Sequence, residues 1–226
     1  MDLTDKRVVV TGAAGLVGSH LAAALADDND VLAVDGGYFL TGYTRGDPEY
    51  GQDGFGMEVD ADGGQRWQNT FWAGINATDT INAAITRADG GYVCAGETDR
   101  FDDGWLVTLE PNGDLDWNES YNGGGNDRFN AVVEHEEGGF VGAGASDSGE
   151  GTDTAGWLLY VDEEGQRVWG RSHRVSSDDP TNSYNDYNEY YDIEPKTDGF
   201  IVCGATAYDP EENDRRGWVA DVNIGG

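Results

Sequence analysis

Short apolar segments bounded by glycine recur along most of the chain, and one kind opens with an aromatic residue and closes with glycine four positions later. Glycine also stands immediately before each copy. Short apolar runs set between turn-forming residues are typical of β-strands. The pattern therefore predicts strands of one type at Tyr38–Gly42, Tyr92–Gly96, Phe140–Gly144 and Phe200–Gly204.

Other segments accompany each copy at regular places. A second element begins with glycine at positions 54, 104, 156 and 217, and a third places Trp four residues after a glycine. Acidic turns such as Asp60–Gly63 separate these two elements, and their residues tolerate tight turns. A fourth apolar stretch begins at Ile81 and at Phe129, and its third copy, near Tyr190–Lys196, is degenerate. The sequence thus predicts four strands per repeat, with copies spaced 48 to 60 residues apart.

Repeats of this length with four strands match the blade of a β-propeller. The predicted fold class is mainly β, a partial β-propeller of about 3.5 four-stranded blades. Large flat rings suit packing between blades, and Trp67, Trp117 and Trp169 occupy one repeat position. The expected blades cover residues 36–89, 90–137, 138–198 and 199–226.

Closure of such a ring is left open by the sequence, because propellers usually have about four to eight blades. The N-terminus supplies the missing strands, a second chain completes the ring, or the chain forms an open arc whose exposed edges favour self-association.

The repeat also carries a family resemblance. The Gly-x-x-x-Trp element after an acidic turn, as in YVDEEGQRVW, resembles the propeller repeats of pyrroloquinoline-quinone type. The whole unit, GGYxxxG…GWLVxL…NGxxxW, is still more similar to secreted propeller repeats of archaea and bacteria. This resemblance spans residues 36–226 and implies the architecture without a ligand. A quinone cofactor would need a cation beside a ring-binding site, and the sequence displays none.

Residues 1–35 follow a different pattern. Arg7–Val10 is a short apolar run typical of a buried strand, and it is followed by TGAAGLVG and the Ala/Leu-rich Ser19–Ala26. Val31–Val34 then predicts a second strand. We expect a short Rossmann-like βαβ fragment here, preceding the repeats of residues 36–226. The segment VLAVD also fits the fourth strand of a blade that runs into the next blade, so both interpretations remain.

The glycines of this segment have the spacing of a dinucleotide-binding turn. Gly12 allows a tight turn, Gly15 lets the backbone approach a pyrophosphate, and Gly18 lets the helix pack on the strand. The N–H groups at the helix N-terminus favour phosphate. Asp35 stands where a carboxylate would accept hydrogen bonds from ribose hydroxyls. These four residues are the candidate cofactor-binding positions.

Strand, glycine motif, helix and acid together resemble the N-terminus of the extended short-chain dehydrogenases, the NAD-dependent epimerases and dehydratases. The resemblance covers residues 5–35 and implies NAD as cofactor. The Tyr-x-x-x-Lys pair of that family is absent, because Asp192 stands four residues before Lys196 and Pro195 breaks a helix. An NAD-binding relative would therefore be catalytically incomplete. We predict no catalytic residues, and no cofactor under the main hypothesis.

Charge restricts the partners. With 44 acidic and 13 basic residues the chain has a formal charge of −31, and Lys6 and Lys196 are its only lysines. This composition resembles that of halophilic archaeal proteins, whose acidic surfaces stay hydrated in concentrated salt. Nucleic acids and anionic membranes are poor partners for such a surface. Hydrated cations, a second copy or another chain are better ones.

Targeting signals and cysteines add little. No apolar run reaches membrane-spanning length, and the start MDLTDKR leads into a strand, not a secretory segment. The chain as written is expected in the cytoplasm, although its repeats resemble proteins that are often exported. Cys94 and Cys203 lie in different repeats, and we expect small buried residues there.

Candidate sites among the repeats are few. The acidic turns lack a complete calcium loop, so solvated hairpins and no metal site are predicted. We expect Asp127-Arg128 to pair within its own blade, and Tyr184, Tyr187, Tyr190 and Tyr191 either to stack on a carbohydrate or to form a loop between blades. The main hypothesis is a non-enzymatic propeller-repeat protein of a halophile, a binding or structural module. The alternative is the NAD-dependent relative. A natural fusion and a truncated product both fit the change of pattern near Asp35.

Overall fold

A computed structural model describes residues 30–34, 36–45, 51–74, 77–98, 103–147, 154–174, 187–207 and 215–223. All regular structure in these ranges is β, in fifteen strands. The expectation of a mainly β chain is confirmed for this part. The same ranges contain no helix with the length and apolar character needed to cross a membrane.

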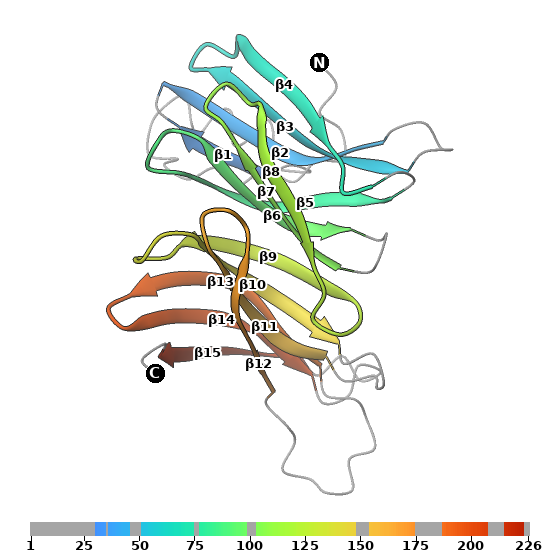
Figure 1. Ribbon diagram of the computed structural model, residues 1–226, viewed down its shortest axis with the longest axis vertical. Helices are drawn as coiled ribbons and strands as arrows, with labels where there is room; N and C mark the ends of the chain where they lie inside the picture. The colour runs from blue at the N-terminus through green and yellow to red at the C-terminus, as the bar shows by residue number, and fades with distance from the viewer. Residues whose placement is uncertain are drawn as a thin grey trace, which may run out of the picture.

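The strands follow one another as antiparallel meanders, which we call units 1 to 4 (Figure 1). Unit 1 comprises β1 (Asp30–Val34), β2 (Gly37–Arg45), β3 (Gln52–Asp60) and β4 (Gln65–Phe71). Unit 2 comprises β5 (Asp79–Thr86), β6 (Tyr92–Thr98), β7 (Asp103–Leu109) and β8 (Leu115–Tyr121). Unit 3 comprises β9 (Asp127–Glu134), β10 (Phe140–Asp147), β11 (Thr154–Val161) and β12 (Arg167–His173). Unit 4 comprises β13 (Tyr187–Lys196), β14 (Gly199–Ala207) and β15 (Arg215–Asn223).

Turn chemistry explains why the third strand of a unit returns as the fourth. Gly63, Gly113 and Gly165 have φ between +79° and +84°, a region that favours glycine. In each turn this glycine donates its N–H to the acidic residue three positions earlier. A β-bulge precedes every one of these turns, at the last residues of β3, β7 and β11. The acidic segments are therefore hairpin turns of one geometry.

The core lies between the units. Trp105 and Trp157, at one repeat position, are fully buried against the preceding unit, and Trp157 stacks on Phe129 with ring centroids 4.7 Å apart. Glycine faces these rings, because a Cβ on Gly54 would lie 2.7 Å from Trp105. Three apolar clusters fill the spaces between successive units. Each unit thus buries its apolar faces only by stacking on its neighbours.

A second contact on the outside of the sheets also joins neighbouring units, and we call it the Trp–Gly seam. Trp67 of β4 lies against Gly113 in the turn of unit 2, where a Cβ would come within 2.4 Å of the indole. Trp117 of β8 lies in the same way against Gly165 in the turn of unit 3. Its Nε1 also donates to the Glu163 carbonyl at 2.9 Å. The outer strand of one unit therefore grips the turn of the next.

The sheets start one strand earlier than the expected repeat boundaries. Units 2 and 3 begin with the apolar stretches at Ile81 and Phe129, which the sequence placed last in a blade. Unit 1 likewise begins with β1, which pairs antiparallel with β2 from Asp30 to Val34. This is the pairing of a repeat strand, one of the two interpretations that VLAVD left open. A boundary at residue 35 falls in the β1–β2 turn. The rest of the predicted βαβ fragment lies outside the described residues.

Candidate functional site

The first strands of units 2, 3 and 4 lie side by side and bring three consecutive repeat positions together. The first position, Asp79, Asp127 and Asn188, is buried and holds the backbone. Asp79 accepts from the Ala73 N–H at 2.8 Å, and Asp127 accepts from the Gly123 N–H at 2.5 Å. The third position, Ile81, Phe129 and Tyr190, is buried in the core. The position between them holds Thr80, Arg128 and Glu189, which share no chemistry.

A repeated β-bulge sets the spacing of these strands. In each one the ladder gains an extra residue just after the core position, at Asn82, Asn130 and Tyr191. Asn82 donates to the Phe129 carbonyl at 3.0 Å, and Asn130 donates to the Tyr190 carbonyl at 2.7 Å. Bulges re-aim side chains without ending a strand. Here they bond each first strand to the next one.

Arg128, Asn130, Tyr187 and Glu189 form a connected set that we call the Arg128 cluster. The Arg128 Nε donates to Glu189 at 2.6 Å, and its guanidinium also donates to the Tyr187 hydroxyl at 2.5 Å. Asn130 and the Tyr187 hydroxyl donate to the same Glu189 carboxylate. Burial alone would raise the pKa of Glu189, but the Arg128 hydrogen bond and charge hold it below its usual range. Glu189 is therefore ionised and fixed.

A cavity of about 160 Å³ opens beside this cluster, and we call it the Arg128 cavity. Burial raises the pKa of Glu97, Arg128 lowers it and Glu189 raises it, with a net rise. Glu97 makes no hydrogen bond to the described residues, so its carboxylate is available to a ligand. Burial also raises the pKa of Asp127, which the Ser146 hydroxyl and two backbone N–H groups counter in part. The cavity is lined by Thr78, Thr80, Glu97, Thr98, Asn126, Asp127 and Arg128.

Sequence reasoning missed this arrangement. Arg128 does not pair within its own unit, as expected, but with Glu189 of unit 4, 61 residues away. The degenerate third copy of the first strand concealed the relation, since Glu189 aligns with Arg128 only once the bulges are matched. Tyr187 belongs to the cluster, Tyr190 is buried, and Tyr191 is exposed. Alignment of Thr80, Arg128 and Glu189 is the signal that could have found the site.

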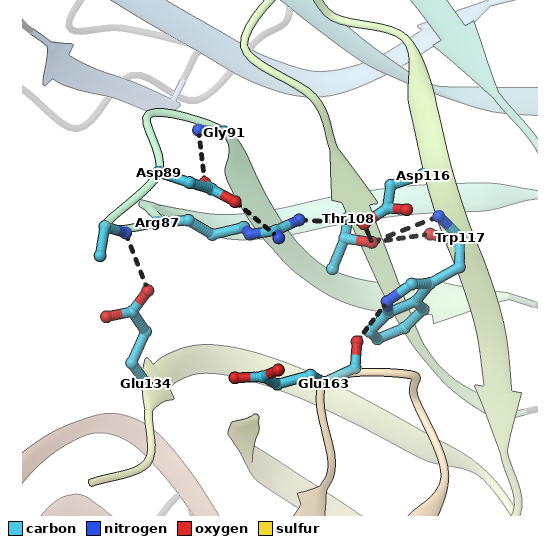
Figure 2. A network of polar contacts seen from close by, with 9 residues as sticks. Arg87, Asp89, Gly91, Thr108, Asp116, Trp117, Glu134 and Glu163 are labelled. Atoms are coloured by element: carbon cyan, nitrogen blue, oxygen red, sulfur yellow. Dashed lines mark hydrogen bonds and ion pairs between the residues drawn. The ribbon is translucent and has the colours of Figure 1, made fainter. Parts of the chain in front are cut away.

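A larger cavity of about 430 Å³ lies at the other end of the same strands, and Figure 2 shows the polar contacts around it. Arg87 donates to Asp116 at 3.0 Å and pairs with Asp89 at 2.7 Å. The Ala88 N–H donates to Glu134 of unit 3 at 3.2 Å, close to the bond between Trp117 and Glu163. The Arg87 guanidinium is thus already paired, and these contacts join unit 2 to unit 3. We assign this cavity to the junction between units.

The predicted cofactor positions Gly12, Gly15, Gly18 and Asp35 lie outside the described residues. The described acidic turns hold no group of three or more metal-ligating side chains, and the same is true of the rest of the described ranges. His173 bonds the Tyr190 hydroxyl at 2.8 Å, and His135 stacks on Tyr160 with ring centroids 4.1 Å apart. Both are therefore part of the packing between strands.

No family model matches the chain, and no curated protein sequence is similar to it. Among solved structures, the chain is similar to the crystal structure of an endo-arabinase from Bacteroides thetaiotaomicron VPI-5482. The TM-score is 0.49 and the identity 12%, over 87% of this chain and 75% of that chain. At this level the likeness carries no argument about activity, and the site above stands on its own geometry.

Proposed function

We propose that the chain is a non-enzymatic repeat module of the β-propeller type, from a salt-adapted protein, that binds a small polar ligand in the Arg128 cavity. The observation that carries the proposal is the contrast between neighbouring repeat positions. The buried positions on either side keep one structural task in units 2, 3 and 4, whereas Thr80, Arg128 and Glu189 differ in every unit. A scaffold that repeats its packing and varies a single position at a cavity is suited to recognition.

The propeller architecture itself is supported by the Trp–Gly seam, which occurs twice with the same residue types. Each seam sets the next unit on the same side of the previous one, as expected for blades arranged around an axis. Convergence of the first strands on the Arg128 cluster agrees with a central position for these strands.

Charge defines the class of ligand. Glu97, Asp127 and Glu189 outnumber Arg128, so the surroundings of the cavity are formally negative and disfavour anions. Glu97 accepts hydrogen bonds, and threonine hydroxyls and Asn126 both donate and accept them. The cavity is below the roughly 300 Å³ at which drug-sized sites begin. It therefore suits a small neutral or cationic ligand, or one end of a larger one, that donates hydrogen bonds.

Binding is favoured over catalysis because the second carboxylate of the cavity is already used. Asp127 is bonded to the backbone of Gly123 and Gly124 and holds the loop before β9. Acid–base pairs in hydrolysis need two carboxylates that both reach the substrate. The described lining residues include no histidine, cysteine or lysine that would replace it.

Thermal unfolding with a panel of monosaccharides and short diamines tests this role, in molar KCl. We expect at least one class to raise the midpoint of the wild type but not of Glu97→Gln. Glu110→Gln, which changes an exposed turn carboxylate, is the matched control and should respond like the wild type. Equal responses of all three proteins to every probe would exclude the cavity as the binding site.

A further inference from the structure

The third strand of unit 4 differs from its counterparts in having one unpaired edge. In units 1 to 3 the strands β3, β7 and β11 each lie between a second and a fourth strand. β15 pairs with β14 along its whole length, and no described strand pairs with its other edge. Such an edge presents a row of backbone N–H and C=O groups that can pair with another strand.

Burial points in the same direction. Val219 of β15 is 71% exposed, whereas Leu106 and Leu158 at the same repeat position are 0% exposed. Ile201 of β14 is 37% exposed, and its counterparts Val93 and Val141 are 0% exposed. The unit therefore presents to solvent an apolar face of the kind that the other units bury.

The indole of Trp218 gives an independent sign that a strand belongs on this edge. Its counterpart Trp105 has its Nε1 3.4 Å from Asn118 on the fourth strand of unit 2. The Nε1 of Trp218 is buried and has no hydrogen-bond partner in the structure. Unit 4 is thus built like the others up to the point where its fourth strand would begin.

The edge of β15 also lacks the features that protect edge strands. Proteins shield exposed edges with Pro, Lys, bulges or alternating charges. β15 contains no Pro or Lys, and its ladder with β14 has no bulge over nine residue pairs. The outer strands β4, β8 and β12, by contrast, are mostly exposed, polar strands, and each is bulged against its neighbour.

We propose that β15 pairs antiparallel with β15 of a second copy of this chain, across a two-fold axis at Val219. All pairs of third and fourth strands in units 1 to 3 are antiparallel. A strand that pairs with its own copy across a perpendicular two-fold axis is also antiparallel, so each copy supplies the other's fourth strand. Val219 is the midpoint of Arg215–Asn223, which places Val219 opposite Val219 and buries both side chains.

Charge favours a second copy at this strand in particular. Two copies of a chain with formal charge −31 repel over most of their surfaces. β15 holds two arginines and one acid, Asp221, which is paired with Lys196 at 2.7 Å. The strand is therefore formally positive within an acidic chain. The proposal does not depend on the Arg128 cavity, which lies at the first strands.

Sedimentation analysis of the full chain in molar KCl tests the pairing. We expect twice the chain mass of 24.3 kDa for the wild type and a single chain mass for Val219→Lys. Val168→Lys changes an equally exposed valine on β12 and should remain a dimer. Circular dichroism checks that both variants are folded. A monomeric wild type, or a dimer that Val219→Lys leaves intact, would overturn the proposal.

Hydrogen exchange and cross-linking decide between a second copy and another segment of the same chain. Directly opposite residues have Cα atoms roughly 4.5–5.5 Å apart, within the range of a disulfide. Oxidation should therefore link Cys203→Ser/Val219→Cys into a covalent dimer, and leave the control Cys203→Ser/Val168→Cys unlinked. A monomer whose β15 amides are nevertheless protected would assign the edge to the same chain and refute the two-fold pairing. A dimer that fails to cross-link would refute the register at Val219.

Discussion

Glu97 and Glu189 lie on either side of one arginine, and their pKa values move in opposite directions. Glu189 takes the hydrogen bond of Arg128, and the pKa of its carboxyl falls below the usual range although the group is buried. Glu97 receives only the more distant charge of the same arginine, and burial raises its pKa. A half-buried carboxylate without a partner is costly to fold. Its presence at a cavity is what a site retained for recognition would produce.

Glu97→Gln should therefore stabilise the protein near neutral pH. The raised pKa means that the folded state holds the Glu97 proton more tightly than the unfolded state, so the carboxyl imposes no penalty in acid. The penalty grows as the pH rises from the ordinary range of a glutamate through the raised folded pKa, and is constant above it. We expect the gain of Glu97→Gln in chemical unfolding to follow this rise, and Glu110→Gln to show no such profile. A gain that is largest in acid would contradict this assignment.

The turns between third and fourth strands show how one element performs two tasks. Glycine at their αL position satisfies the hairpin, and in units 2 and 3 the missing Cβ also makes room for a tryptophan of the preceding unit. Gly63 has the same backbone conformation, with φ +84°, and no heavy atom within 4 Å of the place of its Cβ. Gly63 and Gly113 therefore separate backbone strain from contact across the seam.

Gly113→Ala and Gly63→Ala measure the seam directly. Both substitutions place a side chain at positive φ, at a cost of about 1 kcal/mol. Only Gly113→Ala also meets Trp67, and overpacking adds about 1–3 kcal/mol. Urea unfolding should show the larger loss for Gly113→Ala, and the excess should shrink in a Trp67→Ala background. Equal losses for the two alanine variants would show that the seam contributes nothing to stability.

The molecule as a whole combines strong apolar packing between units with a surface that repels itself. Forty-four acidic residues face only thirteen basic ones, and the ion pairs among the described residues are few. Screening by salt reduces this repulsion, because the Debye length falls from about 10 Å at 0.1 M to about 3 Å at 1 M. Stability should therefore depend on salt more than on any single contact.

Raising KCl from roughly 0.1 M to 2 M should increase the midpoint of thermal unfolding, with most of the rise below about 1 M, where screening changes fastest. Glycine betaine at matched osmolality is the control, because it is excluded from protein surfaces without screening charge. Scanning calorimetry checks both series. A midpoint that is flat or falls with KCl, or a rise that betaine reproduces in full, would count against self-repulsion as the cause.

Much of the β-structure could be predicted from the sequence, because each strand coincides with a short apolar run closed by glycine. The phase of the units could not, since a repeating pattern of four strands has no marked beginning and only hydrogen bonding shows that β5 pairs with β6. The Arg128 cluster was also hidden. It joins Arg128 to a residue beyond an insertion, and its recognition requires matching bulges that leave no signature in composition. Asn82 and Asn130 were visible in INAAIT and FNAVVE, but their role depends on the next strand.

The Trp–Gly seam has a consequence for the order in which this chain acquires its shape. Trp117 finds its carbonyl partner 46 residues later in the sequence, at Glu163. During synthesis from the N-terminus, the outer strand of a unit is therefore finished well before the turn that receives its indole has been made. Docking must proceed in one direction, each new unit capturing the one before it. A pause or a break between units would leave an unclaimed tryptophan at the growing end, and ribosome-bound chains of increasing length would reveal it as a stepwise loss of indole exposure.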